Sequence, residues 1–196
     1  MVISLIPLEN FPNEFMAGLF SIIFILFILI ELRIFIKNRR LITKDDKGSL
    51  LIILTSIFVS LSLLIILSFS SFGRINLMWS YGGLVVVVFG FGLRQWSIFL
   101  LKHFFTPAIT FQKNHILIKK GPYKLIRHPS YTGLLLEIAG VGLFLSNWIS
   151  SLISLFIMFL SLTYRIALEE KFLIKEFGKE YLIYMKETKK FIPFLY

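Results

Sequence analysis

The chain has 196 residues, of which 57% are hydrophobic and 16% are charged, and its mean hydropathy is +0.82. Soluble domains do not reach this apolar content, so the composition predicts an integral membrane protein. The absence of Cys excludes a disulfide framework, a thiolate metal site and a cysteine nucleophile. The net charge of +10 comes from basic residues at the ends of apolar stretches, where they contact membrane lipids, and this placement argues against a nucleic-acid partner.

Five apolar stretches are candidates for transmembrane helices, because a hydrocarbon core of about 30 Å needs roughly 20 helical residues. We expect them at residues 15–36, 49–73, 77–101, 132–145 and 148–164. The last two are short and are separated by Ser146-Asn147, which predicts a helical hairpin. The third stretch contains glycines that suit close contact between helices in lipid, namely Gly82, Gly83, Gly90 and Gly92. The expected fold class is therefore an all-α membrane protein with about five transmembrane helices.

The distribution of basic residues predicts the orientation of these helices, because cytoplasmic loops are enriched in Lys and Arg. The end of the first stretch and the loop after it contain Arg33, Lys37, Arg39, Arg40, Lys44 and Lys47. The loop after the third stretch contains Lys102, Lys113, Lys119, Lys120, Lys124 and Arg127. The loop after the second stretch has only Arg74. We therefore expect the N-terminus outside the cell and the C-terminus in the cytoplasm.

A helical pattern continues after the last apolar stretch, over residues 165–190, where aromatic and apolar residues recur every three or four positions. Gly178 is expected to stop or bend this cytoplasmic segment. The segment would lie along the membrane surface or fold back over a site. No repeat or linker interrupts the chain, so residues 1–196 are interpreted as one membrane-embedded domain.

The first polar cluster, residues 121–131, combines prolines, aromatic rings and basic side chains at the start of the fourth helix. Pro122 and Pro129 favour turns before them, so backbone amides point out of a helix N-terminus here. The positive end of a helix attracts anionic or electron-rich ligands, and Arg127 and His128 lie at this end. The plain alternative is that His128 only caps the helix.

The second polar cluster consists of Arg165, Glu169 and Glu170. Arg165 and Glu169 are four residues apart and share a helix face, where Arg can hold a carboxylate and Glu can accept hydrogen bonds. The plain alternative is a surface ion pair of small energetic value. Glu137, inside the fourth stretch, is a functional candidate because intramembrane carboxylates are costly. It could instead reach the mouth of the site or pair with a basic side chain.

Metal and dinucleotide sites are not predicted. His103, His115 and His128 lack the spacing of metal ligands, and no His-Glu-x-x-His motif occurs. Gly90-Phe91-Gly92 is not followed by a third glycine at the required distance, so the Rossmann fingerprint is absent.

Several motifs follow one another in a fixed order between residues 115 and 184. They are His115-x-Leu117, Gly121-Pro122-Tyr123, Arg127-His128-Pro129-Ser130-Tyr131-x-Gly133, Arg165-x-x-x-Glu169-Glu170 and Phe177-Gly178-x-Glu180-Tyr181-x-x-Tyr184. In this order the motifs resemble the isoprenylcysteine carboxyl methyltransferase family and its bacterial and archaeal relatives. The earlier stretch Asp46-Lys47-Gly48-Ser49 resembles the bacterial branch.

This resemblance implies an enzyme that transfers a methyl group from S-adenosylmethionine to a lipidic or prenylated acceptor, most simply at a carboxylate. It implies that the catalytic residues Arg165 and Glu169 orient the acceptor, and that the cofactor region covers about residues 115–133 and 165–190. The residues expected to bind the cofactor are His115, Leu117, Gly121, Tyr123, Arg127, His128, Pro129, Tyr131, Gly133 and Glu170. Methyl transfer needs alignment and exclusion of water rather than a covalent nucleophile, so it does not require Cys.

Three alternatives stay open from the sequence alone. Related enzymes methylate phospholipid amines, although Arg165 favours a carboxylate acceptor over an amine. Membrane sterol or steroid reductases that use NADPH share an Arg-His-Pro-x-Tyr-x-Gly segment, but an acidic-plus-cysteine pattern would be expected there in place of Glu169-Glu170. The third alternative is a membrane protein without catalytic activity. The sequence indicates no oligomeric state.

Overall fold

A computed structural model of the chain describes residues 14–38, 48–106, 109 and 116–191. Helices are the only regular secondary structure in these ranges, as the all-α prediction requires. The α-helices are α1 (Glu14–Asn38), α2 (Ser49–Ser68), α3 (Trp79–Leu101), α4 (Pro129–Phe144), α5 (Trp148–Phe177) and α6 (Lys179–Glu187). Two 3-10 helices, η5 (Lys102–Phe104) and η6 (Gly121–Lys124), lie between α3 and α4.

Within the described ranges, α2, α3 and α5 are long and apolar enough to cross a membrane, whereas the apolar helix α4 has 16 residues. The outward faces of these helices carry large apolar side chains, such as Phe58 (72% exposed) and Phe156 (63% exposed). Their buried positions include serines, and Ser60 and Ser154 donate hydrogen bonds to each other's carbonyl oxygens between α2 and α5. An apolar exterior around hydrogen-bonded small residues is the arrangement that lipid favours.

Helices α3 and α4 pack against each other through glycines. An added Cβ atom would lie 2.3 Å from a backbone atom of α4 at Gly83, and 2.8 Å from one at Gly90. Gly82 and Gly92 would place a Cβ atom in open space. The predicted close contact is therefore confirmed for Gly83 and Gly90, and the other two glycines of α3 do not take part in it.

The turn between α4 and α5 lies at residues 145–147, where the Ser-Asn pair predicted a break. Asn147 Oδ1 accepts a hydrogen bond from the backbone N–H of Ser150 at 3.0 Å, which caps α5. Its Nδ2 donates to the carbonyl oxygens of Leu67 and Phe72, each at 3.0 Å. One side-chain amide thus fixes both the start of α5 and the end of α2.

Helix α2 ends at Ser68, five residues before the end of the apolar stretch at 73. Residues 69–73 form turns, and these turns present the carbonyl group of Phe72 that Asn147 binds. A purely apolar stretch therefore predicted a longer helix than the chain forms.

Helix α5 crosses the predicted boundary at 164 and continues to Phe177. The composition changes from apolar to charged at Arg165, but a change in polarity does not end a helix. No Gly or Pro occurs until Gly178, whose φ of +54° ends α5 at the predicted stop. The membrane boundary at 164 stays a prediction.

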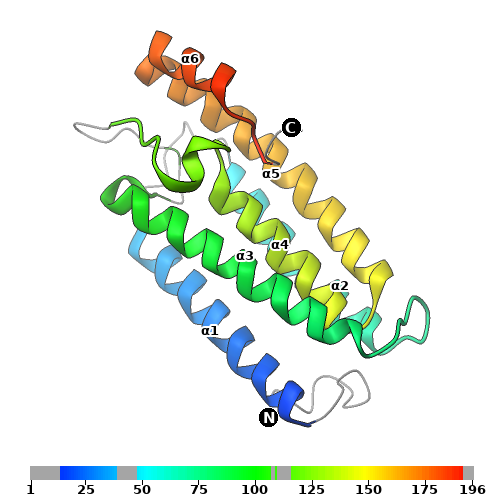
Figure 1. Cartoon of the computed structure of the whole chain (residues 1–196). Helices are drawn as coiled ribbons and strands as arrows, with labels where there is room; N and C mark the ends of the chain where they lie inside the picture. The colour runs from blue at the N-terminus through cyan, green and yellow to red at the C-terminus, as the bar shows by residue number, and fades with distance from the viewer. Residues whose placement is uncertain (1–13, 39–47, 107–108, 110–115, 192–196) are drawn as a thin grey trace.

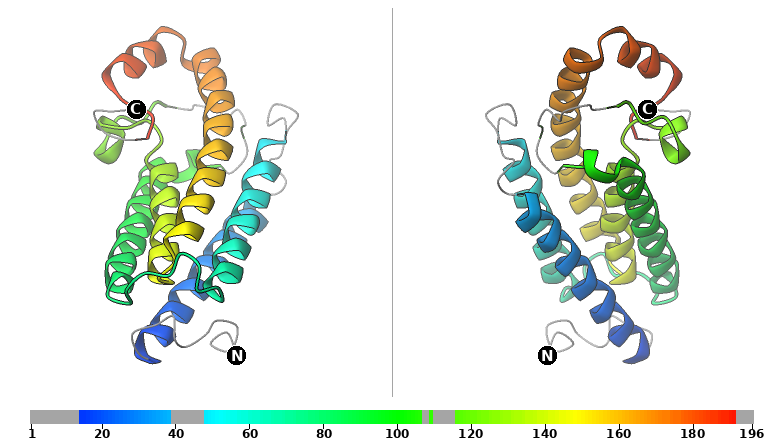
Figure 2. Two further views of the ribbon diagram at one scale, coloured as in Figure 1. Left: turned by 90° about the vertical axis from the view of Figure 1, so that its right-hand side faces the viewer. Right: turned by 90° about the vertical axis from the view of Figure 1, so that its left-hand side faces the viewer.

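Figure 1 shows α3, α4 and α5 side by side, with α6 folded back from the end of α5. In both views of Figure 2, α6 and the chain after it return toward the loop that precedes α4. This corresponds to the fold-back arrangement expected for residues 165–190. The two polar clusters of the sequence therefore lie at the same end of the helical bundle.

Candidate functional site

The segment before α4 is shaped by a glycine, a proline and a 3-10 turn. Gly121 has a φ of +58°, and a Cβ atom there would lie 2.7 Å from Cδ1 of Leu100. Pro129 occupies the first turn of α4, where the missing N–H costs nothing. His128 is the N-cap residue, but its side chain makes no capping hydrogen bond. A role for His128 as a cap alone is therefore not supported.

Residues 188–191, which we name the C-terminal strap, run beside residues 125–128. Three backbone hydrogen bonds of 2.7 to 3.2 Å pair this loop with Lys189 and Lys190. Phe191, at the end of the strap, is 1% exposed and belongs to the hydrophobic core. The strap thereby fixes the backbone of the Arg-His-Pro segment.

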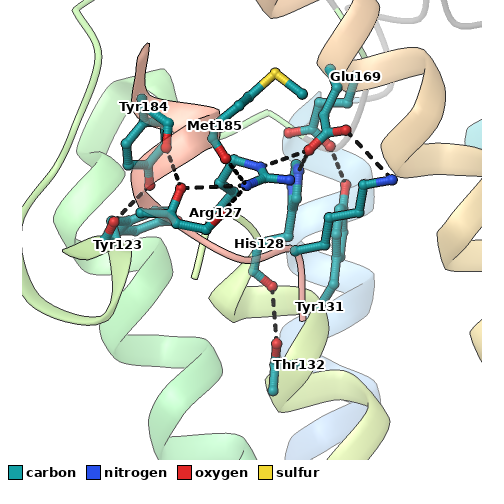
Figure 3. Close-up of polar contacts among 11 residues, drawn as sticks. Tyr123, Arg127, His128, Tyr131, Thr132, Glu169, Tyr184 and Met185 are labelled. Atoms are coloured by element: carbon teal, nitrogen blue, oxygen red, sulfur yellow. Dashed lines mark hydrogen bonds and ion pairs between the residues drawn. The ribbon is translucent and has the colours of Figure 1, made fainter. Parts of the chain in front are cut away.

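Arg127 is the centre of a buried network of charged and polar groups (Figure 3). Its Nε donates a hydrogen bond to Oε1 of Glu170 at 2.8 Å. Its Nη1 donates to the carbonyl oxygens of Met185, at 3.1 Å, and of Thr188. His128 Nε2 lies 3.5 Å from the same oxygen of Glu170. Arg127 therefore joins the loop to α5, to the end of α6 and to the strap, and the buried charges compensate one another.

Tyr131 links the two residues predicted to be catalytic. Its hydroxyl donates a hydrogen bond to Oε2 of Glu169 at 2.8 Å and accepts one from Nε of Arg165 at 3.4 Å. Nη1 of Arg165 also donates to the hydroxyl of Ser49, at the start of α2. Arg165 is only 2% exposed, so the alternative of a surface ion pair is wrong. The imidazole of His128 stacks on the Tyr131 ring, with centroids 5.7 Å apart.

A cavity opens beside these side chains. Its charged and polar lining comes from Tyr123, Arg127, His128, Ser130, Tyr131, Arg165 and Glu169. Its apolar and aromatic lining includes Leu101, Leu117, Phe172, Phe177, Tyr181 and Tyr184. A cavity lined by both charged and apolar side chains suits a ligand that is itself part polar and part apolar.

Two tyrosines join α6 to the loop on one side of the cavity. The hydroxyl of Tyr184 donates to the carbonyl oxygen of Tyr123 at 2.7 Å, and the hydroxyl of Tyr123 donates to the carbonyl oxygen of Ser97 at 3.4 Å. Burial raises the pKa of both phenols above the ordinary tyrosine value. Both side chains are therefore neutral hydrogen-bond donors at physiological pH.

The structure brings most of the predicted site residues together. Five of the residues expected to bind the cofactor line the cavity, and they are Leu117, Tyr123, Arg127, His128 and Tyr131. The two residues expected to be catalytic, Arg165 and Glu169, line it as well. Gly121, Pro129 and Glu170 shape or hold this wall without lining it. His115 lies outside the described residues.

Gly133 and Glu137 lie apart from the cavity. A Cβ atom added to Gly133 would lie 2.6 Å from the carbonyl oxygen of Gly90, so Gly133 permits the contact of α4 with α3. Its role in cofactor binding stays a prediction. Glu137 is 3% exposed and is not among the described residues that line the cavity.

Sequence reasoning did not assign a role to Ser49 or to the strap. The resemblance of residues 46–49 to the bacterial branch was a signal for Ser49, but it carried no chemical role. The strap pairs with the loop through backbone atoms. Such pairing between segments about 60 residues apart in the sequence leaves no side-chain pattern to recognise.

Comparisons with known proteins identify related sequences and a related solved structure. Residues 83–175 match the model of the isoprenylcysteine carboxyl methyltransferase (ICMT) family. A probable protein-S-isoprenylcysteine O-methyltransferase of Oryza sativa subsp. indica is 34% identical over 118 residues, which cover 59% of this chain and 62% of that protein. The protein-S-isoprenylcysteine O-methyltransferase of Saccharomyces cerevisiae is 34% identical over 115 residues, which cover 58% of this chain and 48% of that protein. The chain thus spans less than two thirds of the length of either relative.

A solved structure of the eukaryotic intramembrane Ras methyltransferase ICMT is also similar, with a TM-score of 0.61 and 25% sequence identity. The similarity covers 72% of this chain and 52% of that one. The region that matches the family model, residues 83–175, contains both polar clusters. The resemblance predicted from the motifs is therefore confirmed, and over these residues the chain matches the isoprenylcysteine carboxyl methyltransferase family.

Proposed function

We propose that this chain is a membrane enzyme that transfers a methyl group from S-adenosylmethionine to a carboxylate on a lipidic or prenylated acceptor. The main support for the proposal is that residues of both polar clusters line one cavity and contact each other. The names of the similar proteins support an acceptor of the isoprenylcysteine type. The apolar residues that line the cavity are consistent with the prenyl or lipid chain of such an acceptor.

When bound, S-adenosylmethionine supplies an electrophilic methyl group on a positively charged sulfonium. The cavity fits a cation of this kind, because Glu169 offers negative charge and Tyr181 and Tyr184 offer aromatic rings. Leu117, Tyr123, His128 and Tyr131 would hold the rest of the cofactor. Arg127 and Glu170 keep this wall in place through their ion pair. The proposal retains the other positions predicted from the family, His115, Gly121, Pro129 and Gly133.

Arg165 would bind and orient the acceptor carboxylate. Its planar guanidinium matches a carboxylate with two parallel hydrogen bonds, and its burial strengthens the attraction. A carboxylate is already ionised at neutral pH, so the protein needs no general base to activate it. The contribution of the protein is then alignment and exclusion of water. Tyr131, which is held by Glu169, would fix the position of the Arg165 side chain.

We also propose a single domain with five membrane-crossing helices, α1 to α5, in which α4 and α5 form a hairpin. The N-terminus would lie outside the cell and the cavity at the cytoplasmic end. The contact of Ser49 with Arg165 supports this arrangement, because it places the start of α2 at the cavity end. Lys119, Lys120 and Lys124 lie in the loop of the same end, as cytoplasmic loops require.

The alternatives from the sequence receive less support. An amine acceptor would have to lose a proton before attack, and Arg165, the side chain proposed to bind the acceptor, offers only hydrogen-bond donors and cannot hold an ammonium group. The names of the similar proteins give no support to an NADPH-dependent reductase or to a protein without activity.

Two measurements test this proposal. The melting temperature of the purified protein should rise with S-adenosylhomocysteine and should not change with NADPH, because only a ligand of the folded state stabilises it. Tritiated methyl groups from S-adenosylmethionine should appear in a base-labile ester of N-acetyl-S-farnesylcysteine. Label in the headgroup of phosphatidylethanolamine vesicles would show that the acceptor is an amine rather than a carboxylate. Stabilisation by NADPH alone would refute methyl transfer altogether.

A further inference from the structure

The guanidinium of Arg165 has a partner from a part of the chain that the motifs did not include. Nη1 donates a hydrogen bond to the hydroxyl of Ser49, the first residue of α2, while Nε donates to the hydroxyl of Tyr131. Ser49 is 0% exposed. Hydroxyl groups from two different helices, α2 and α4, therefore hold two different nitrogen atoms of one buried side chain.

The packing of α2 against α5 explains why Ser49 lies at this position. Ser60 and Ser154 form hydrogen bonds between the same two helices further along the bundle. Ser49 precedes Ser60 by 11 residues and Arg165 follows Ser154 by 11 residues, as one antiparallel register requires. Gly48, with a φ of +72°, is the N-cap residue of α2 and directly precedes Ser49. The contact is thus part of a regular helix pairing rather than an isolated approach.

The chemical nature of these two contacts suits a role in ligand binding. These two acceptors are neutral hydroxyls, and their hydrogen bonds to two nitrogen atoms fix the direction of the guanidinium. An arginine side chain has many rotamers, and fixing the guanidinium in advance lowers the entropy lost when a carboxylate binds.

We propose that Ser49 is a positioning residue, whose hydroxyl holds the guanidinium of Arg165 in the orientation that binds the acceptor carboxylate. The inference rests on the proposed function and extends it to a residue of α2, outside the region that matches the family model. Ser49 itself acts only through Arg165.

The test compares Ser49→Ala with Ser49→Thr, which keeps the hydroxyl, and with Ser60→Ala. Ser60→Ala is the matched control, because it removes a hydrogen bond between the same two helices far from Arg165. The measurements are kcat and KM for N-acetyl-S-farnesylcysteine and the Kd for S-adenosylhomocysteine. Ser49→Ala should raise KM for the acceptor about three- to tenfold, the effect of one lost hydrogen bond, with the Kd unchanged. Ser49→Thr should recover most of this loss, and Ser60→Ala should keep the wild-type KM.

This inference would be overturned if the KM for the acceptor is unchanged in Ser49→Ala, or if it rises equally in Ser60→Ala. Neither result would affect the proposed methyl transfer, as long as the wild-type protein is active. If Ser49→Ala does not fold, Ser49→Cys decides in the same way, because it keeps the volume but offers only a weak acceptor. A wild-type protein that methylates no acceptor would refute the proposed function, and the role of Ser49 with it.

Discussion

The cavity end of the bundle and the contact between α3 and α4 are built in opposite ways. At the cavity end, large charged and phenolic side chains satisfy one another, since Arg127 donates to Glu170 and Tyr131 donates to Glu169. At the helix contact, Gly83 and Gly90 bring the backbones together by having no side chain. The first region holds groups that a ligand can use, whereas the second tolerates no added atom. Substitutions should therefore separate ligand binding and turnover from stability.

The largest effect is expected at the cavity end, for Arg165→Ala. Loss of the buried guanidinium that is proposed to bind the acceptor carboxylate should lower kcat/KM by about 100-fold. The affinity for S-adenosylhomocysteine should stay nearly unchanged, because Arg165 is proposed to hold the acceptor. Arg165→Lys, which keeps the charge but not the planar fork, should recover part of the activity. Loss of cofactor binding together with turnover would reverse the assignment of roles.

At the helix contact, Gly83→Ala should lower the free energy of unfolding by about 1 to 3 kcal/mol, the range seen for overpacked positions. Its methyl group would lie 2.3 Å from the backbone of α4. Gly82→Ala is the control, since its methyl group meets nothing within 4 Å. It should be neutral or stabilise the helix by up to about 1 kcal/mol. Thermal unfolding in detergent measures both, and equal effects of the two variants would contradict the packing described.

At the end opposite the cavity, Asn147→Ala should destabilise the protein by about 2 kcal/mol, because it removes a helix cap and two hydrogen bonds to carbonyl oxygens. Asn147→Asp keeps the capping acceptor but places a buried carboxylate against two carbonyl oxygens, so it should destabilise the protein at least as much as Asn147→Ala. The Kd for S-adenosylhomocysteine should not change in either variant. A weaker cofactor affinity would mean that the two ends of the bundle are coupled.

The smallest effect is expected for Tyr184→Phe, which removes the hydrogen bond from α6 to the carbonyl oxygen of Tyr123. The loss should be about 1 kcal/mol of unfolding free energy, as for one buried hydrogen bond. Tyr164→Phe is the control, because Tyr164 is 42% exposed on α5. A stability change in the control as large as that in Tyr184→Phe would contradict the anchoring role of this phenol.

The two regions also differ in how far the sequence predicts them. Proline and glycine signals predicted a helix start near Ser130, close to the observed start of α4 at Pro129, and a stop or bend at Gly178, where α5 ends, because these residues restrict or extend the backbone locally. The family motifs predicted most of the side chains that line the cavity. The glycines of α3 predicted close packing, but only their position on the helix decides that Gly83 takes part and Gly82 does not.

Other features depend on contacts between distant segments, which a single sequence does not specify. The strap at 188–191 pairs with the loop through backbone atoms, and the hydroxyl of Ser49 meets Arg165 across 116 positions. The sequence predicted helix on both sides of residue 164, but it assigned the apolar and the charged part to separate segments. The structure joins them in the single helix α5, because nothing in the backbone ends the helix there.

The central claim is that both polar clusters bind one cofactor molecule in one cavity. Ultraviolet cross-linking of tritiated S-adenosylmethionine, followed by mapping of the labelled peptides, tests it most directly. We expect label in peptides from residues 116–131 and from residues 165–184, and protection of both by excess S-adenosylhomocysteine. Protected label confined to peptides of α1, α2 or the turn at 145–147 would contradict the claim.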